Sequence, residues 1–326
     1  MSCGIARDNS VDGENMMTMS IRGVALFATA FFALSAGISQ AAPRALVSPL
    51  AKPDGLLYVA VDGQLLIYRQ DGAGPIGRIT KGIDGPMGLA VDSAGTLYVA
   101  NATAGNVTVY PAGARSPSLV LSDGLHQPLD VAVGADGTVY VANNAASFYS
   151  GTVVEYRAGQ TQPFFTTPPY NSSGTATFFN DAVDANGNVF VSATIGSSFG
   201  QGVLEYPAGA SPSWEFLLTS NYLREALAGL AIDRRGHLVV AEEGGISAPG
   251  EIDVVDVAQR QVLRKIGRDY DGANAVRLDR GSFQLFASDP DRPIVFVYAY
   301  KSGKLVRRLH IAGTNITGIA LGPAAK

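Results

Sequence analysis

A four-part pattern recurs along this chain and strongly restricts its fold. Each copy has a short apolar strand, a turn, a second strand that is apolar throughout, and a third strand ending near a tyrosine. The residue that closes the first strand falls, in steps of 42 to 50 residues, at Asp92, Gly134, Asp184, Asp233, Asp279 and Gly322. A repeat of this length built from four short strands is typical of a β-propeller, in which each unit is one blade.

The connection between the first two strands of a unit has the composition of a hairpin turn. It falls at residues 92–95, 136–137, 186–187 and 235–236, and each of these segments ends in glycine. Asp-Gly and Asn-Gly pairs accept the positive φ angles that such turns require. We therefore expect short antiparallel strands and almost no helix.

Residues 55–79 form an incomplete unit that begins directly at a second strand. The missing first strand is present at the other end of the chain, at residues 317–321. Pairing of these two segments would close the ring, whereas an open ring would leave unpaired strand edges. The sequence thus predicts an all-β, six-bladed β-propeller over residues 55–326, with its N-terminal and C-terminal strands closing one blade and residues 42–54 as a lead-in.

Composition excludes several classes of protein. Hydrophobic residues make up 47% of the chain, which excludes wholesale disorder. The net charge of −4 argues against a nucleic-acid-binding protein, because such proteins present a basic face. Five inner strands carry alanine where the propeller axis leaves little room, and Arg277 replaces it in the sixth. We expect Arg277 to pair with an acid, since an unpaired buried charge is unfavourable.

Residues 1–41 have the features of a secretory signal. Arg22 precedes an apolar run at residues 24–36, and residues 39–41 end with the small residues of a cleavage site. The run is too short for a membrane span. We expect cleavage near Ala41 and a secreted or periplasmic product, with Met19 as the start of the signal and an upstream extension before it.

The segment P-x-G-L-A-V-D-x-x-G-x-L-Y-V-A at residues 86–100 resembles NHL-repeat proteins and, more distantly, the SMP-30/gluconolactonase-like six-bladed propellers. The resemblance covers residues 55–323. In the gluconolactonase group it implies a divalent-metal site with ligands five residues before the closing Asp. Those positions here are Met87, Leu129, Phe179, Ala228, Asn274 and Thr317, none of which is a carboxylate. Calcium and magnesium sites need several oxygen ligands, including carboxylates.

Polar residues on or beside the inner strands are the candidates for a ligand site at the channel mouth. They are Asp130, Asn180, Asp181, Asn274 and Arg277, together with His126, the one histidine that precedes an inner strand. The alternative is that they cap strands and line a water-filled channel. Glu242 and Glu243 raise a similar choice, between a cation site shared with Asp289 or Asp291 and a solvated loop.

Aromatic residues among small polar ones mark a candidate binding rim. Long loops on a rigid scaffold often carry function, and interfaces are enriched in aromatic side chains. The alternative is that these rings seal the gaps between blades. The candidates are Phe148, Tyr149, Phe179 and Phe199.

The sequence contains neither a G-x-S-x-G nucleophile motif nor a phosphate-binding loop. We therefore predict no catalytic or metal-ligating residue and no cofactor. The leading hypothesis is a monomeric binding module that takes a protein, peptide or glycan on one rim, without a nucleic-acid partner or a membrane span. The alternative is a metal-dependent lactonase-like hydrolase or lyase that uses Ca²⁺ or another divalent cation.

Overall fold

A computed structural model describes residues 55–72, 74–145, 150–170, 176–196, 200–209, 213–219, 227–242, 250–270, 273–289 and 291–323. The chain divides into two units, Met1–Val47 and Ser48–Lys326, and all of the described residues belong to the second. The predicted signal segment and its cleavage site lie outside them.

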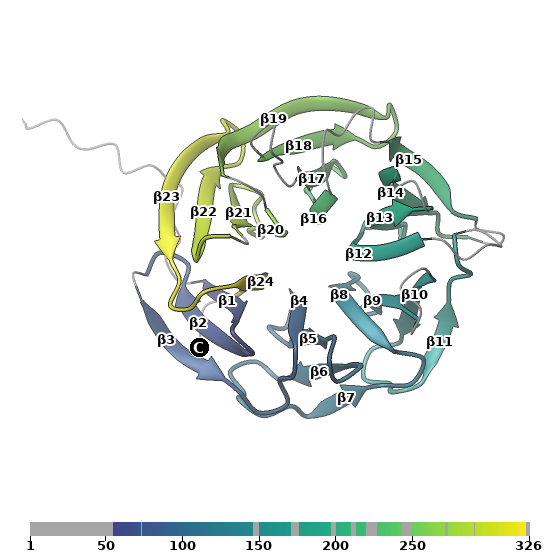
Figure 1. The fold of residues 1–326 in the computed structure, drawn as a ribbon, viewed down its shortest axis with the longest axis horizontal. Helices are drawn as coiled ribbons and strands as arrows, with labels where there is room; N and C mark the ends of the chain where they lie inside the picture. The colour runs from purple at the N-terminus through teal and green to yellow at the C-terminus, as the bar shows by residue number, and fades with distance from the viewer. Residues whose placement is uncertain are drawn as a thin grey trace, which may run out of the picture. The chain divides into compact units, whose positions relative to one another are not determined.

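The described residues form 24 strands in six four-stranded antiparallel sheets, which are the blades of a ring (Figure 1). Blade 1 contains β24 (Ile316–Gly322), β1 (Leu56–Val61), β2 (Gln64–Arg69) and β3 (Pro75–Ile79). Blade 2 contains β4 (Pro86–Val91), β5 (Leu97–Asn101), β6 (Asn106–Tyr110) and β7 (Leu119–Leu121). Blade 3 contains β8 (Gln127–Val133), β9 (Val139–Asn144), β10 (Gly151–Tyr156) and β11 (Pro163–Thr166).

The other half of the ring repeats this arrangement. Blade 4 contains β12 (Ala176–Val183), β13 (Val189–Ile195), β14 (Gly200–Tyr206) and β15 (Glu215–Thr219). Blade 5 contains β16 (Leu227–Ile232), β17 (Leu238–Glu242), β18 (Gly250–Asp256) and β19 (Gln261–Tyr270). Blade 6 contains β20 (Ala275–Leu278), β21 (Gln284–Ser288), β22 (Ile294–Ala299) and β23 (Lys304–His310). The part of the chain described here contains no helix, and thus none that could cross a membrane.

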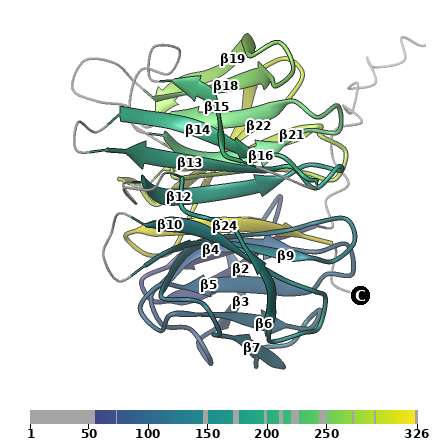
Figure 2. The same ribbon diagram turned by 90° about the vertical axis from the view of Figure 1, so that its right-hand side faces the viewer.

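The predicted six-bladed all-β propeller is therefore confirmed, together with its closure by the two ends of the chain. Strand β24 pairs antiparallel with β1, with Tyr58 opposite Ala320 and Val59 opposite Ile319. The first strand of each blade lies nearest the axis and the fourth lies at the periphery (Figure 1). Seen from the side, blade 5 and blade 1 lie on opposite sides of β12 (Figure 2).

The predicted hairpin turns are confirmed as well. Asp184 Oδ1 accepts hydrogen bonds of 2.8 and 2.9 Å from the backbone amides of Asn186 and Asn188. Gly187 in this turn has φ +85°, a conformation that side chains disfavour. Asp92 and Asp233 hold the same turn in blades 2 and 5. These short turns connect the inner strand directly to the second strand in blades 2, 4 and 5.

The core lies between adjacent blades, as expected for apolar second strands covered on both faces. In β5 and β17 every residue is buried. Tyrosines at the ends of third strands are buried too, and Tyr110 donates a 2.7 Å hydrogen bond to the Lys81 carbonyl. Burial of such rings provides much of the apolar stabilisation that holds neighbouring blades together.

Candidate functional site

The inner strands surround a cavity of about 270 Å³ at the mouth of the channel, which we call the axial cavity. Its walls come from five blades, mainly from the first half of each inner strand. The lining residues are Met87, Gly88, Leu129, Asp130, Phe179, Asn180, Ala193, Thr194, Gln201, Asn274, Ala275, Arg277, Thr317 and Gly318.

Arg277 crosses the channel from blade 6 to blade 3, on the far side of the ring (Figure 1). Its Nη2 lies 3.1 Å from Asp130 Oδ1, so the predicted pairing with an acid is confirmed. The guanidinium also donates hydrogen bonds to the carbonyls of Leu89 (3.0 Å) in β4 and Leu230 (3.3 Å) in β16. One side chain thus connects four blades, and the charge of the partly buried Arg277 compensates that of the buried Asp130.

Asp181 brings a second carboxyl group beside this ion pair. It is 2% exposed, and neither carboxylate oxygen forms a hydrogen bond. Its backbone amide donates to Asp130 Oδ2 at 3.3 Å. Burial and the nearby Asp130 charge raise the pKa of Asp181 well above its ordinary value. Burial raises the pKa of Asp130 too, but the adjacent Arg277 guanidinium opposes this effect, so Asp181 is the acid of the pair that favours the neutral form.

The positions of these acids are unusual within the repeat. Asp130 stands where the inner strands of blades 1, 2 and 5 have Gly318, Gly88 and Gly229. A Cβ on Gly88 would lie 1.9 Å from Asp130 Oδ1, so glycine in β4 leaves the space that Asp130 fills. Asp181 stands where the other five inner strands have a leucine, valine or isoleucine.

Two of the polar residues at the mouth hold neighbouring blades together. Asn274 donates a 2.5 Å hydrogen bond to the Ile316 carbonyl and accepts one of 2.6 Å from Ser288. Thr317 donates a 2.7 Å hydrogen bond to the Pro86 carbonyl. These side chains join blade 6 to blade 1 and blade 1 to blade 2, and their bonding capacity is largely used.

Three other polar side chains in the wall remain free. Asn180, Thr194 and Gln201 form no side-chain hydrogen bond with any residue that the structure describes. Thr194 and Gln201 lie directly opposite each other in β13 and β14. Phe179, which is 37% exposed, lines the cavity next to them. Blade 4 thus presents two side-chain amides, a hydroxyl and an aromatic ring to a ligand in the axial cavity.

The structure places some of the residues predicted from the sequence at the axial cavity and others away from it. Asp130, Asn180, Asn274, Arg277 and Phe179 line the axial cavity, and Asp181 is buried behind it. His126 is exposed and is not among the lining residues. The rim candidates Phe148, Tyr149 and Phe199 lie outside the described residues. Thr194 and Gln201 were not predicted, because the sequence alone does not show that two central strands of blade 4 reach the mouth.

The prediction for Glu242 requires a correction. Glu242 is 2% exposed, so the solvated-loop interpretation is wrong for this residue; Glu243 lies outside the described residues. Its carboxylate gathers with those of Glu251 and Asp253, and Lys265 Nζ contacts Glu251 and lies 3.4 Å from Asp253. Asp289, one of the two expected co-ligands, instead pairs with Arg292 at 2.7 Å. The cross-strand register of β17, β18 and β19 creates this grouping.

The axial cavity does not match the metal site that the gluconolactonase resemblance implies. Asp130 is engaged by Arg277, and Asp181 favours its neutral form. The groups that remain free are amides and a hydroxyl, whereas Ca²⁺ and Mg²⁺ sites use several oxygen ligands with negative charge among them. We therefore assign no metal chemistry to this cavity.

Many solved structures share the architecture. A chain in a structure titled a nidogen/laminin complex aligns with a TM-score of 0.63 at 16% identity, covering 82% of this chain and 98% of that one. A Bacteroides caccae protein of unknown function gives 0.63 at 13% identity, with coverages of 82% and 99%. Kuenenia stuttgartiensis hydrazine synthase gives 0.58 at 13% identity, with coverages of 81% and 85%.

These similarities establish the propeller fold alone. No protein-family model matches the sequence. No curated protein matches it either.

Proposed function

We propose that this chain is a binding module whose axial cavity accepts a polar group from a protein or peptide. The observation that carries the proposal is the set of free polar side chains in blade 4, Asn180, Thr194 and Gln201, beside the exposed ring of Phe179. Sites that recognise ligands combine an apolar wall with a few polar groups that fix orientation. The similar chain in a nidogen/laminin complex supports a protein ligand.

The charged groups of the cavity support the same proposal. Arg277 is fixed by three hydrogen-bonded partners on other blades, so it keeps the wall rigid. A rigid wall lowers the entropy lost on binding. We infer that ligand recognition depends on the amides of Asn180 and Gln201, and that Arg277 and Asp130 act as scaffold.

The test is binding by the full chain to a peptide library and a glycan array, with wild type and the Asn180→Ala/Gln201→Ala variant. We expect a peptide ligand whose affinity falls at least tenfold in the variant, because two hydrogen bonds of about 1 kcal/mol each are lost. Gln261→Ala, an exposed glutamine at the periphery of blade 5, is the matched control and should bind like wild type.

Two results would overturn the proposal. A ligand that binds the wild type and the Asn180→Ala/Gln201→Ala variant equally well would show that the axial cavity does not recognise it. Binding to glycans and to no peptide would show that the ligand is a glycan and not a protein or peptide.

We also propose export and a relationship to NHL-repeat proteins. The apolar run at residues 24–36 and the 86–100 pattern support these proposals. Expression of the full chain in a secreting host tests the first, since N-terminal sequencing should find a product that begins near Ala42. An intracellular product that retains residues 24–36 would contradict it.

A further inference from the structure

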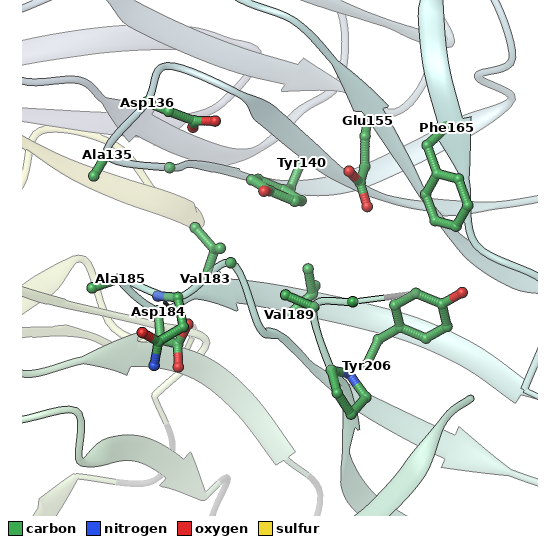
Figure 3. A pocket seen from close by; sticks show the side chains of 16 residues that line it. Ala135, Asp136, Tyr140, Glu155, Phe165, Val183, Asp184, Ala185, Val189 and Tyr206 are labelled. Carbon is green, nitrogen blue, oxygen red and sulfur yellow. Dashed lines mark hydrogen bonds between the residues drawn. The ribbon is translucent and has the colours of Figure 1, made fainter. Parts of the chain in front are cut away.

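A second, larger cavity lies between blades 3 and 4, at the end of the inner strands opposite to the axial cavity. It has a volume of about 590 Å³, within the range of ligand pockets, and we call it the inter-blade groove. Figure 3 shows Tyr140, Glu155 and Phe165 of blade 3 on one side, with Val189 and Tyr206 of blade 4 on the other. Three aromatic rings and a carboxylate therefore face the same space.

Glu155 is the acid of this groove that has no structural role. Asp136 and Asp184 also line it, but Asp136 accepts a 2.8 Å hydrogen bond from Thr138 Oγ1, and Asp184 holds its hairpin turn. Among the described residues, the Glu155 carboxylate has neither a hydrogen bond nor an ion pair, although its side chain is half-buried. Burial and the charge of Asp136 raise the pKa of Glu155 to about 7.

The corresponding region of the next pair of blades, 4 and 5, contains an arginine. Glu205 of β14 corresponds to Glu155, since each precedes the tyrosine that ends its strand. Glu205 lies opposite Glu215, and Arg260 of blade 5 binds Glu215 at 3.3 Å. The chain thus supplies its own guanidinium to the acids at this position.

The groove between blades 5 and 6 also contains an arginine. The pair Glu155 and Phe165 of blade 3 corresponds in register to Val254 and Arg264 of blade 5. The Arg264 guanidinium lies over the ring of Tyr300, 4.4 Å from its centroid. A guanidinium therefore stacks on a tyrosine in a groove of the same kind.

The inter-blade groove of blades 3 and 4 lacks such a residue. None of its lining residues is basic, and the nearby Arg157, which affects the pKa of Asp136, lies over the ring of Phe164 instead. Aromatic faces and a carboxylate are the groups that bind a guanidinium best.

We propose that the inter-blade groove binds the arginine side chain of a partner polypeptide, with Glu155 as the carboxylate and Tyr140, Phe165 and Tyr206 as the aromatic walls. The site is separate from the axial cavity and does not depend on the function proposed for it. Glu155 must be ionised to bind the cation. The other titratable groups that line the groove are acids and tyrosines, and the nearby Arg157 lies over the ring of Phe164. Affinity therefore falls as the pH drops from 8 to 6.

The test is calorimetric titration of the full chain with acetyl-Gly-Arg-Gly-amide and with its citrulline counterpart, which has the same shape without the charge. At pH 8 we expect at least tenfold tighter binding of the arginine peptide, and a several-fold loss at pH 6. Glu155→Gln should remove the preference for arginine and the pH dependence. Glu205→Gln, which changes the corresponding glutamate of the next blade, should bind like wild type.

Phe165→Ala provides a second variant that does not alter charge. Phe165 is 37% exposed, so its removal should leave the melting temperature nearly unchanged and weaken binding several-fold while the pH dependence remains. Equal binding of the arginine and citrulline peptides would overturn the proposal. So would Glu155→Gln or Phe165→Ala proteins that bind like wild type, or tighter binding of a lysine peptide.

Discussion

At the scale of single residues, the centre of the ring is a buried group of two carboxyls and one guanidinium. Asp130 and Arg277 compensate each other, and Asp181 is the additional acid. A buried acid with a raised pKa holds its proton in the folded state more tightly than in the unfolded chain. Such a group makes the free energy of unfolding decrease as pH rises.

Asp181→Asn should therefore flatten the pH dependence of stability. In wild type, the Asp181 contribution is lost as pH rises above the ordinary aspartate pKa of about 4 and through its raised folded value. The slope from one such proton reaches about 1.4 kcal/mol per pH unit. Urea unfolding from pH 4 to pH 8 measures it, and equal slopes in wild type and variant would contradict the raised pKa.

At the scale of elements, adjacent inner strands approach closely where one carries glycine. A Cβ on Gly88 of β4 would lie 2.4 Å from the Cα of Asp130 in β8. Because the obstacle is backbone, rotation of a side chain cannot relieve the clash. The pairing of a glycine on one strand with an aspartate on the next thus sets the spacing of blades 2 and 3.

We expect Gly88→Ala to destabilise the protein by about 3 kcal/mol, since overpacking of a closed core forces backbone shifts. Chemical denaturation followed by tryptophan fluorescence or circular dichroism measures this loss. Gly74→Ala is the matched control, because a Cβ at Gly74 meets no atom within 4 Å. Equal stabilities of the two variants would show that β4 and β8 separate easily.

At the scale of the whole molecule, one blade contains both ends of the propeller. Strand β24 fills the innermost position of blade 1, and the Asp62 carboxylate accepts a 2.7 Å hydrogen bond from Thr314 Oγ1. The buried core of this blade includes Val59 of β1 and Ile319 of β24. Loss of β24 would expose the edge of β1 and open the ring.

A chain that ends at residue 315 should therefore lose cooperative folding as a unit. Thermal unfolding followed by circular dichroism should change from one sharp transition to a broad one at a lower temperature. A chain that ends at Pro323 keeps β24 and is the control. A sharp transition at the wild-type temperature in the shorter chain would show that closure contributes little.

The repeat made the architecture predictable because turns and apolar strands are local features of sequence. Asp181 was a candidate from the sequence, and the same alignment shows it as an acid at a position where the other inner strands are apolar. The group of Glu242, Glu251 and Lys265 was not predictable, since it depends on the register of three strands. Thr194 and Gln201 were missed for the same reason, because their cross-strand pairing brings them to the mouth.

The contacts of Arg277 also determine how molecules can travel through the ring. Its side chain reaches backbone carbonyls in blades 2 and 5 and a carboxylate in blade 3, so it bars the passage along the axis. We expect the axial cavity to open on one side only, so that a ligand enters and leaves by the same opening. We therefore expect that solutes do not cross the ring through its middle, and that two partners on opposite sides would not compete for this cavity.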